Sequence, residues 1–287
     1  MNKFYIIIGC LIVLLFSVAS CSKDNVEYDT TDLKSNMAEF QIHYCAPITN
    51  VSANYINEVL INDSLYANTY APLKPNNAIP NGAVGRFYSV SAGSVNIKLF
   101  TGATNFTQVY DQTCTLNPGK QNIFVYDLNK APIVFDNGYP YTANITANTD
   151  STCWVKFYNF MYENATTPTT LKLQYKCYCK NPSTGLYTDT VAVGKPVAFG
   201  ETTGWQSVKV LKSIFNSSGY CSIYYLIDVI DNNGNVIGSL QITNSSGKIV
   251  NYSDYWTGYI GRRYHHVFGG IRTSKTLRAA VSVFTAL

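Results

Sequence analysis

The chain has few charged side chains and very few histidines. Only 13% of its residues are Asp, Glu, Lys or Arg, and only three of the 287 are His. The 21 basic side chains are scattered among 17 acidic ones and form no block of like charge. Nucleic-acid binding needs a concentrated basic face that displaces counterions from the phosphates. The composition therefore excludes nucleic acid as a partner.

The sequence also lacks the local motifs of catalysis and metal binding. It contains no His-Glu-x-x-His and no Gly-x-Ser-x-Gly, and no cysteine lies in the context of a known thiol enzyme. His265 and His266 are adjacent, so on a strand they point to opposite faces and cannot hold one metal ion together. His43 is distant from both in sequence. We therefore expect no metal, no cofactor and no enzymatic activity.

One apolar run stands at the start of the chain. Met1–Lys3 carries a positive charge, and Phe4–Val18 contains no charged residue. This pattern is typical of a signal peptide. The run is shorter than the ~18–20 residues that a membrane-spanning helix needs, and no second run of that length follows. We expect residues 1–20 to be a signal peptide and no other segment to cross a membrane.

The end of this segment resembles the lipobox of bacterial lipoproteins, because small residues (SVAS) directly precede Cys21. In the lipobox the cysteine thiol takes a diacylglyceryl group before cleavage. The alternative is an ordinary signal peptide with a cysteine near its cleavage site. The resemblance implies a mature protein anchored in a membrane through acyl chains on Cys21, each buried methylene contributing ~0.8 kcal/mol.

The residues after Cys21 suggest where the anchored protein goes. Ser22–Asn25 (SKDN) resembles the export signal of Bacteroidota lipoproteins, in which a Lys and an acidic residue after the lipidated cysteine direct the protein to the outer face. The alternative is a polar spacer without sorting information. We expect residues 21–36 to be a lipidated tether, and the protein to lie at the outer membrane, displayed on the cell surface.

The remaining sequence has an all-β composition, with 23 Tyr and 14 Phe. Aromatic and β-branched residues favour strands, whereas Asn, Gly, Ser and Thr favour turns. Met37–Cys45 and Trp154–Phe160 alternate between apolar and polar residues, as half-buried strands do. Tyr224–Ile242 predicts a hairpin around the turn Asp231–Gly234. Short strands at this spacing indicate a sandwich or a barrel.

A polar segment, residues 137–149, contains two turn signals and looks like a linker. A faint repeat relates the two sides of it, because Val95–Leu116 resembles the hairpin at Tyr224–Ile242. We therefore predict two β-sandwich domains in tandem, at residues 37–136 and 150–287.

This organisation is similar to that of a family of tandem immunoglobulin-like domains of unknown function in Bacteroidota lipoproteins. Ser91–Leu99 (SAGSVNIKL) and Leu116–Lys120 (LNPGK) carry the resemblance, which covers most of the first domain and parts of the second. The second domain departs from the pattern, since Trp205–Val210 lacks the Ala-Gly lead-in and Ser245–Gly258 looks inserted. The family implies an immunoglobulin-like fold and a location, and no activity.

Six cysteines remain after Cys10 and Cys21 are set aside. An exported protein can join them in disulfides, or they can be buried as free thiols that pack like small apolar side chains. Cys177 and Cys179 share one face of an expected strand, so they can face one neighbouring strand but do not easily bond to each other. A zinc site would need a second cysteine pair at finger spacing, and the sequence has none. The sequence leaves the disulfide state and the pairing of the six cysteines open: Cys45, Cys114, Cys153, Cys177, Cys179 and Cys221.

An aromatic cluster near the C-terminus is the candidate ligand site. The segment around Trp256 looks like a loop, where aromatic side chains are harder to explain as core. Together with Tyr252, Tyr255 and Tyr259, Trp256 would form a flat platform on which sugar rings stack. The alternative is that these side chains pack in the core or in a domain interface.

These features predict a non-catalytic surface binding or adhesion module with a glycan or protein ligand. A fimbrial or envelope-assembly subunit is the alternative, and it would show a strand groove open to donor-strand exchange. An enzyme is the third hypothesis, because carboxylates brought together by folding are invisible in one sequence. Asp63–Leu65 (DSL) and Asp189–Val191 (DTV) resemble O-glycosylation triplets of Bacteroidota.

Overall fold

The computed structural model describes residues 36–80, 85–136, 151–181, 184–211, 214 and 220–286. The expected signal peptide, Cys21 and the expected 137–149 linker lie outside the described residues. Within them, regular structure consists of strands and one short 3-10 turn, η1 (Ser52–Asn54), which confirms the prediction of an all-β fold. No helix in this part of the chain has the length and apolar character needed to cross a membrane.

The strands of the first half, residues 36–136, form two sheets. Both sheets contribute to one hydrophobic cluster, which includes Phe40 from one and Leu99 from the other, as in a β-sandwich. The first sheet has the order β4 (Asn77–Ile79), β1 (Met37–Tyr44), β8 (Gly119–Val125) and β9 (Ile133–Asp136), with β5 (Tyr88–Ser91) also paired to β1. The second has the order β3 (Ser64–Ala67), β2 (Ile56–Ile61), β6 (Gly93–Thr101) and β7 (Thr107–Leu116).

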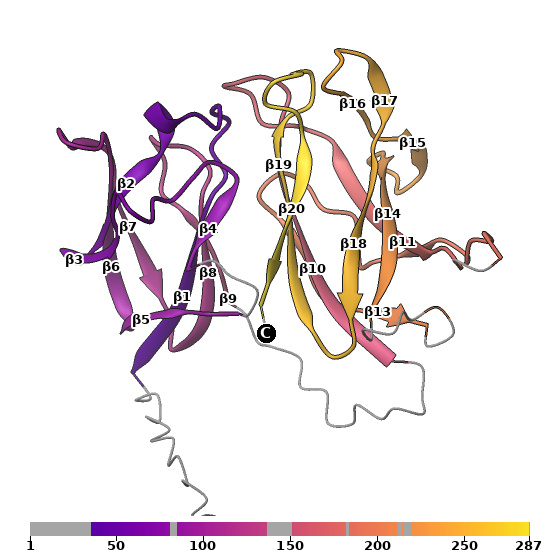
Figure 1. Ribbon diagram of the computed structural model, residues 1–287, viewed down its shortest axis with the longest axis horizontal. Helices are drawn as coiled ribbons and strands as arrows, with labels where there is room; N and C mark the ends of the chain where they lie inside the picture. The colour runs from indigo at the N-terminus through magenta and orange to yellow at the C-terminus, as the bar shows by residue number, and fades with distance from the viewer. Residues whose placement is uncertain are drawn as a thin grey trace, which may run out of the picture. The chain divides into compact units, whose positions relative to one another are not determined.

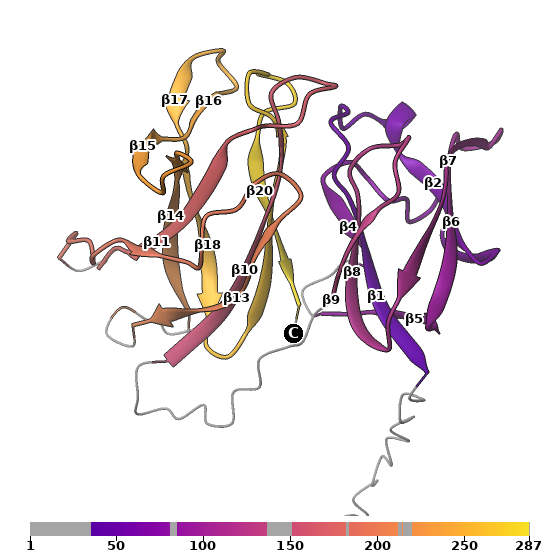
Figure 2. The ribbon, with the colours of Figure 1, turned by 180° about the vertical axis from the view of Figure 1, so that it is seen from behind.

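The second half, residues 151–286, also has two main sheets. One has the order β13 (Thr202–Val210), β10 (Ser151–Tyr162), β19 (Arg263–Ile271) and β20 (Ala280–Thr285). The other has the order β12 (Val191–Ala192), β11 (Lys172–Cys179), β14 (Tyr220–Ile230) and β15 (Val236–Ser239), with β18 (Ser253–Tyr259) also paired to β14; β16 (Gln241–Thr243) and β17 (Ile249–Asn251) form a small hairpin. Figures 1 and 2 show β10, β19 and β20 in one layer and β11, β14 and β18 in the layer facing it.

Each half contains a parallel pair between its first strand and a late strand. β1 runs parallel to β8, with Ile42 opposite Ile123, and β10 runs parallel to β19, with Phe157 opposite His266. Parallel neighbours cannot be joined by a tight turn, so each pair brings together residues far apart in sequence. All four strands are central in their sheets.

The predicted hairpin around Asp231–Gly234 is confirmed, but its second strand ends at Ser239, because Gln241–Thr243 pairs with β17 instead. β14 pairs antiparallel with β15, and the carboxylate of Asp231 accepts the backbone N–H groups of Asn233 and Asn235 at 2.8 Å each. Gly234 has a φ of +88°, a backbone conformation that is unfavourable for residues with a side chain. The turn residues therefore fix this hairpin locally.

The first strand is more buried than its alternation predicts. The sequence assigns Gln41 and His43 to a solvent-facing side, yet the structure buries both, with Gln41 only 3% exposed. The His43 ring stacks on Phe124 at 4.5 Å and meets the edge of Phe284, from β20, at 4.9 Å. The prediction of a half-buried strand is therefore wrong for β1: Phe284 of the second half covers His43, and Gln41 donates to the Arg86 carbonyl within the first half.

A network of polar side chains lies in this covered region. Asn122 on β8 is within 2.9 Å of a ring nitrogen of His265 on β19 and within 3.4 Å of both His43 and the Tyr158 hydroxyl. The Tyr158 hydroxyl is 2.9 Å from His265 Nδ1. Buried polar groups are stable only when they are hydrogen-bonded, so this network connects the first half to β10 and β19 of the second.

Candidate functional site

The predicted aromatic platform lies on a strand, β18, and not in a loop. Trp256 is only 4% exposed and Tyr252 only 6%. Trp256 meets the edge of the His266 ring at 4.6 Å and packs against Tyr225 at 5.7 Å. The prediction that Trp256 and Tyr252 form an exposed platform is therefore wrong: the alternation of β18 turns Trp256 into the core, and Tyr252, just before the strand, also packs there against Tyr225.

The other two predicted platform residues lie on the opposite face of β18. Tyr255 is 58% exposed, and Tyr259 is half-buried. In the register with β14, Tyr255 stands opposite Tyr224 and Tyr259 opposite Tyr220. The outward face of this sheet, rather than the Trp256 region, therefore carries the accessible aromatic side chains.

Four tyrosines cross this outward face in a continuous line, which we call the tyrosine row: Tyr187, Tyr178, Tyr224 and Tyr255. Consecutive ring centroids are 5.5, 5.6 and 5.7 Å apart. The Tyr178 and Tyr224 rings are stacked, with an interplanar angle of 19°. The row begins in the segment before β12, passes through β11 and β14, and ends on β18.

Strand alternation and register together build the row. On β14, Tyr224 lies between the buried side chains of Ile223 and Tyr225, so it must point outward. The antiparallel register then places Tyr178 and Tyr255 directly opposite it on the two neighbouring strands. Such cross-strand aromatic pairs each contribute about 0.2–1 kcal/mol. The two terminal rings are the most open, since Tyr187 is 60% exposed.

Charged groups flank the row on the same side of the sheet. The Lys180 ammonium lies 5.4 Å from the Tyr187 ring, and Lys176 on β11 pairs with Asp228 on β14 at 2.5 Å. The Arg262 guanidinium sits 4.0 Å over the Tyr259 ring. The surface thus combines aromatic faces with hydrogen-bond donors and acceptors, a combination that suits polar ligands with apolar ring faces.

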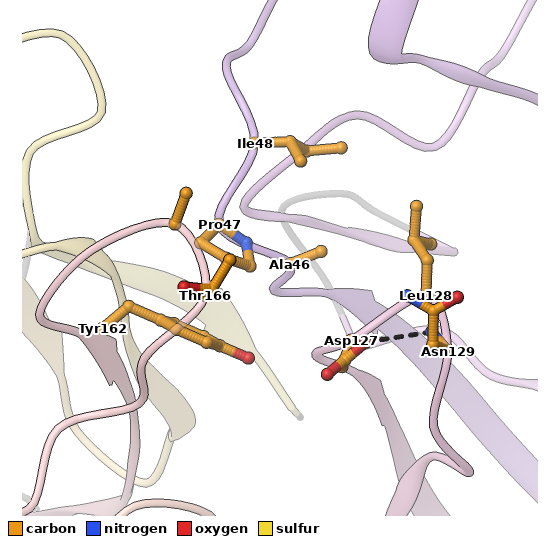
Figure 3. A pocket seen from close by; sticks show the side chains of 9 residues that line it. Ala46, Pro47, Ile48, Asp127, Leu128, Asn129, Tyr162 and Thr166 are labelled. Atoms are coloured by element: carbon orange, nitrogen blue, oxygen red, sulfur yellow. Dashed lines mark hydrogen bonds between the residues drawn. The ribbon is translucent and has the colours of Figure 1, made fainter.

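A cavity of about 260 Å³ lies where the 46–48 and 127–129 segments meet β10. Figure 3 shows Tyr162 across this cavity from Asp127 and Asn129. The Asp127 carboxylate accepts the Asn129 N–H at 2.9 Å and pairs with Lys130 at 3.2 Å. The Tyr162 hydroxyl donates to the Tyr126 carbonyl at 2.7 Å, and burial raises its pKa. Both ionisable groups are therefore held by hydrogen bonds or an ion pair within the protein.

A second pocket, of about 580 Å³, lies by the edge strands β12 and β13. Its lining is mainly apolar, with Asp189 and Lys209 among its polar residues. The lining includes Cys177 and Cys179 of β11. Of these two cavities it is the larger, and its lining includes cysteines.

The three histidines lie in the interior of the protein. All three are fully buried, and burial lowers the pKa of His43 and of His266 to about 3. His265 bonds within the network around Asn122, whereas His266 lies 2.6 Å from the Tyr175 hydroxyl on the other side of β19. Among the described residues no group of three or more His, Cys, Asp or Glu is placed to hold a metal ion.

Sequence reasoning missed the tyrosine row and located only its last member, Tyr255. Tyr178 and Tyr224 each belong to an alternating strand that the sequence does indicate. Their outward position follows from that alternation, but the pairing of one strand with another does not. Comparison with known proteins adds no relative: no family model matches the chain, and no curated protein sequence is significantly similar to it.

Proposed function

We propose that the protein is a lipid-anchored, surface-displayed binding module that takes a carbohydrate ligand on the tyrosine row. The observation that carries the proposal is the row itself, four tyrosine rings at 5.5–5.7 Å spacing on the outward face of one sheet. Contiguous exposed aromatic surface is uncommon on monomeric proteins and marks interaction sites. The proposed function is binding without catalysis. The proposal also includes a relationship to the tandem immunoglobulin-like lipoproteins of Bacteroidota.

Carbohydrate fits this surface for two reasons. The C–H faces of a sugar ring pack on aromatic rings, and a row of evenly spaced tyrosines offers successive rings of an extended oligosaccharide successive places to stack. Sugar hydroxyls also need hydrogen-bond partners, which the tyrosine hydroxyls and the nearby Lys176–Asp228 pair supply.

Removing a central ring of the row should abolish most of the binding. We expect Tyr224→Ala to weaken glycan affinity about 30-fold, since truncating an aromatic hot spot costs about 2 kcal/mol or more. Tyr224→Phe keeps the ring and should keep most of the affinity. The measurement is a glycan array with the full chain in detergent, followed by titration of the best ligand.

Tyr70→Ala is the matched control, because Tyr70 is 98% exposed and belongs to the first half, away from the row. Its affinity should equal that of the wild type. If Tyr224→Ala binds as well as Tyr70→Ala, or if the array shows no carbohydrate binding at all, the proposed site is wrong.

Anchoring rests on Cys21. We expect Cys21→Ala to release the protein from the membrane fraction, because the acyl chains supply the membrane affinity. Membrane fractionation followed by immunoblotting measures this, with Cys10→Ala as the control that should remain anchored. A Cys21→Ala protein held as firmly as the wild type would exclude the lipoprotein interpretation.

Surface display has a separate test. Protease added to intact cells should digest the protein if it faces the medium, while a periplasmic marker stays intact. Complete protection of the protein under these conditions would place it on the inner side of the outer membrane and remove its access to external ligands.

A further inference from the structure

Cysteines are concentrated in the core of the second half. Cys153, Cys177, Cys179 and Cys221 all belong to its main hydrophobic cluster. Buried, isolated thiols behave as small apolar side chains, so burial alone assigns them no chemistry. The pair Cys179 and Cys221 differs from the others in its position.

Cys179 and Cys221 face each other across two paired strands. In the register of β11 with β14, Cys179 stands opposite Ile223, so Cys221 is its diagonal neighbour two residues away on the same inward face. The two thiols influence each other: the Cys221 side chain lowers the pKa of Cys179, and the Cys179 side chain raises the pKa of Cys221. Register and burial thus make the two thiols neighbours in the core of the second half.

The backbone around the pair can allow a bond between the sulfurs. Diagonal neighbours in a regular ladder have Cα atoms about 7–8 Å apart, and a disulfide needs roughly 4.4–6.8 Å. The required approach is about 1 Å. Cys179 is the last residue of β11, where the ladder with β14 ends, and its backbone N–H and carbonyl both bond to Thr188 beyond the strand. A shift of about this size at the strand end would have to carry the Thr188 segment with it.

Cys179 is also the member of the pair that a reagent can reach. It lines the 580 Å³ pocket by β12 and β13, whereas Cys221 does not. Thiolates, rather than thiols, attack disulfides, and a cysteine with a lowered pKa supplies the thiolate more readily. Its place in the pocket lining and its lowered pKa both make Cys179 the attacking residue.

We propose that Cys179 and Cys221 form a thiol pair that a disulfide-bearing oxidant, entering through this pocket, converts to an intramolecular disulfide. The Cys179 thiolate attacks the oxidant's disulfide and expels one of its sulfurs as a thiolate. Cys221 then loses its proton to solvent, and its sulfur attacks Cys179 and expels the second thiolate. Two protein thiols are oxidised by two electrons, the oxidant is reduced to two thiols, and the two protons end on those thiols.

The test uses the full chain in detergent, first reduced and then treated with oxidised glutathione. Free thiols are alkylated after denaturation, and peptides are mapped by mass spectrometry. Lys176 and Lys180 bracket both Cys177 and Cys179, so trypsin leaves these cysteines in one peptide. Chymotrypsin, which cuts after Tyr178, separates them. We expect a peptide crosslinked through Cys179 and Cys221, with the other core cysteines alkylated.

One variant should trap the intermediate, and a second serves as its control. Cys221→Ala should accumulate glutathione on Cys179, because the second attack is missing, whereas Cys177→Ala should form the crosslink as the wild type does. The oxidised wild type should melt on the order of 10 °C higher than the reduced protein, since the bond closes a long loop.

Three results would overturn the proposal: full alkylation of Cys179 and Cys221 after oxidation, a crosslink through Cys153 or Cys177 instead, or loss of the crosslink in Cys177→Ala. The wild-type map decides the first two outcomes without any substitution, so a variant that fails to fold leaves the test intact.

Discussion

The free energy of unfolding is expected to fall steeply once the pH drops below about 6.5. His43 and His266 are fully buried, and desolvation lowers the pKa of each to about 3. Burial lowers the pKa of His265 too, helped by the nearby positive charge of Lys156. In the unfolded chain all three would titrate near 6.5.

The sign of the pH effect on stability follows from whether the folded or the unfolded chain binds more protons. Between pH 6.5 and about 3 the unfolded chain binds a proton at each histidine, whereas the folded chain does not. Stability is therefore complete above pH 6.5 and is lost as the pH falls. Each histidine contributes a slope of about 1.4 kcal/mol per pH unit, so three give about 4 kcal/mol per unit. A domain with a net stability of roughly 5–15 kcal/mol should unfold well before pH 3.

Urea unfolding at pH 8, 7, 6, 5 and 4 measures this effect. His43→Gln is the informative variant, because it removes one titrating group and should reduce the slope by about a third, whatever it does to the stability at pH 8. An unfolding free energy that stays constant from pH 7 to pH 5 would mean that the histidines titrate normally in the folded protein.

Trp256→Ala should destabilise the protein by about 3–5 kcal/mol, which corresponds to a fall in melting temperature on the order of 10 °C. Trp256 fills the core of the second half beside Tyr225 and His266, so its truncation leaves a cavity. Thermal unfolding followed by circular dichroism gives the shift.

The neighbouring residue supplies the control for this prediction. Tyr255→Ala removes a comparable ring from the same strand, but the ring is mostly exposed and should cost about 1 kcal/mol or less. Equal losses for the two variants would contradict the assignment of Trp256 to the core and Tyr255 to the surface. Glycan affinity should respond in the opposite order, falling for Tyr255→Ala more than for Trp256→Ala in the folded protein.

Strands and turns could be predicted from the sequence because their signals are local. The predicted strand Met37–Cys45 forms β1 (Met37–Tyr44), and the Asp231–Gly234 turn forms where its residue types require it. The error at Ser253–Tyr259 has a physical cause. Its Ser, Asp and Gly residues are typical of a loop, and pairing with β14 overrides that local preference.

The candidate site could be predicted only in part, because it depends on register. Tyr178, Tyr224 and Tyr255 come from strands separated by long stretches of sequence, and a shift of one residue in any pairing would turn a ring to the other face. The same reasoning applies to the neighbouring positions of Cys179 and Cys221. The sequence indicates that Cys177 and Cys179 face a single partner strand, and only the register identifies Cys221 in that strand.

The sequence by itself determines the all-β fold, most strand positions and the pattern of inward and outward side chains, because these follow from periodicity over a few residues. Only the tertiary structure decides which outward faces stay in solvent. The polar sides of β1 and β10 are covered, and Asn122, Tyr158 and His265 are buried in one network there. The outward side of β14 stays open and carries the tyrosine row. Burial of this kind depends on contacts between distant segments, for which alternation along one strand contains no information.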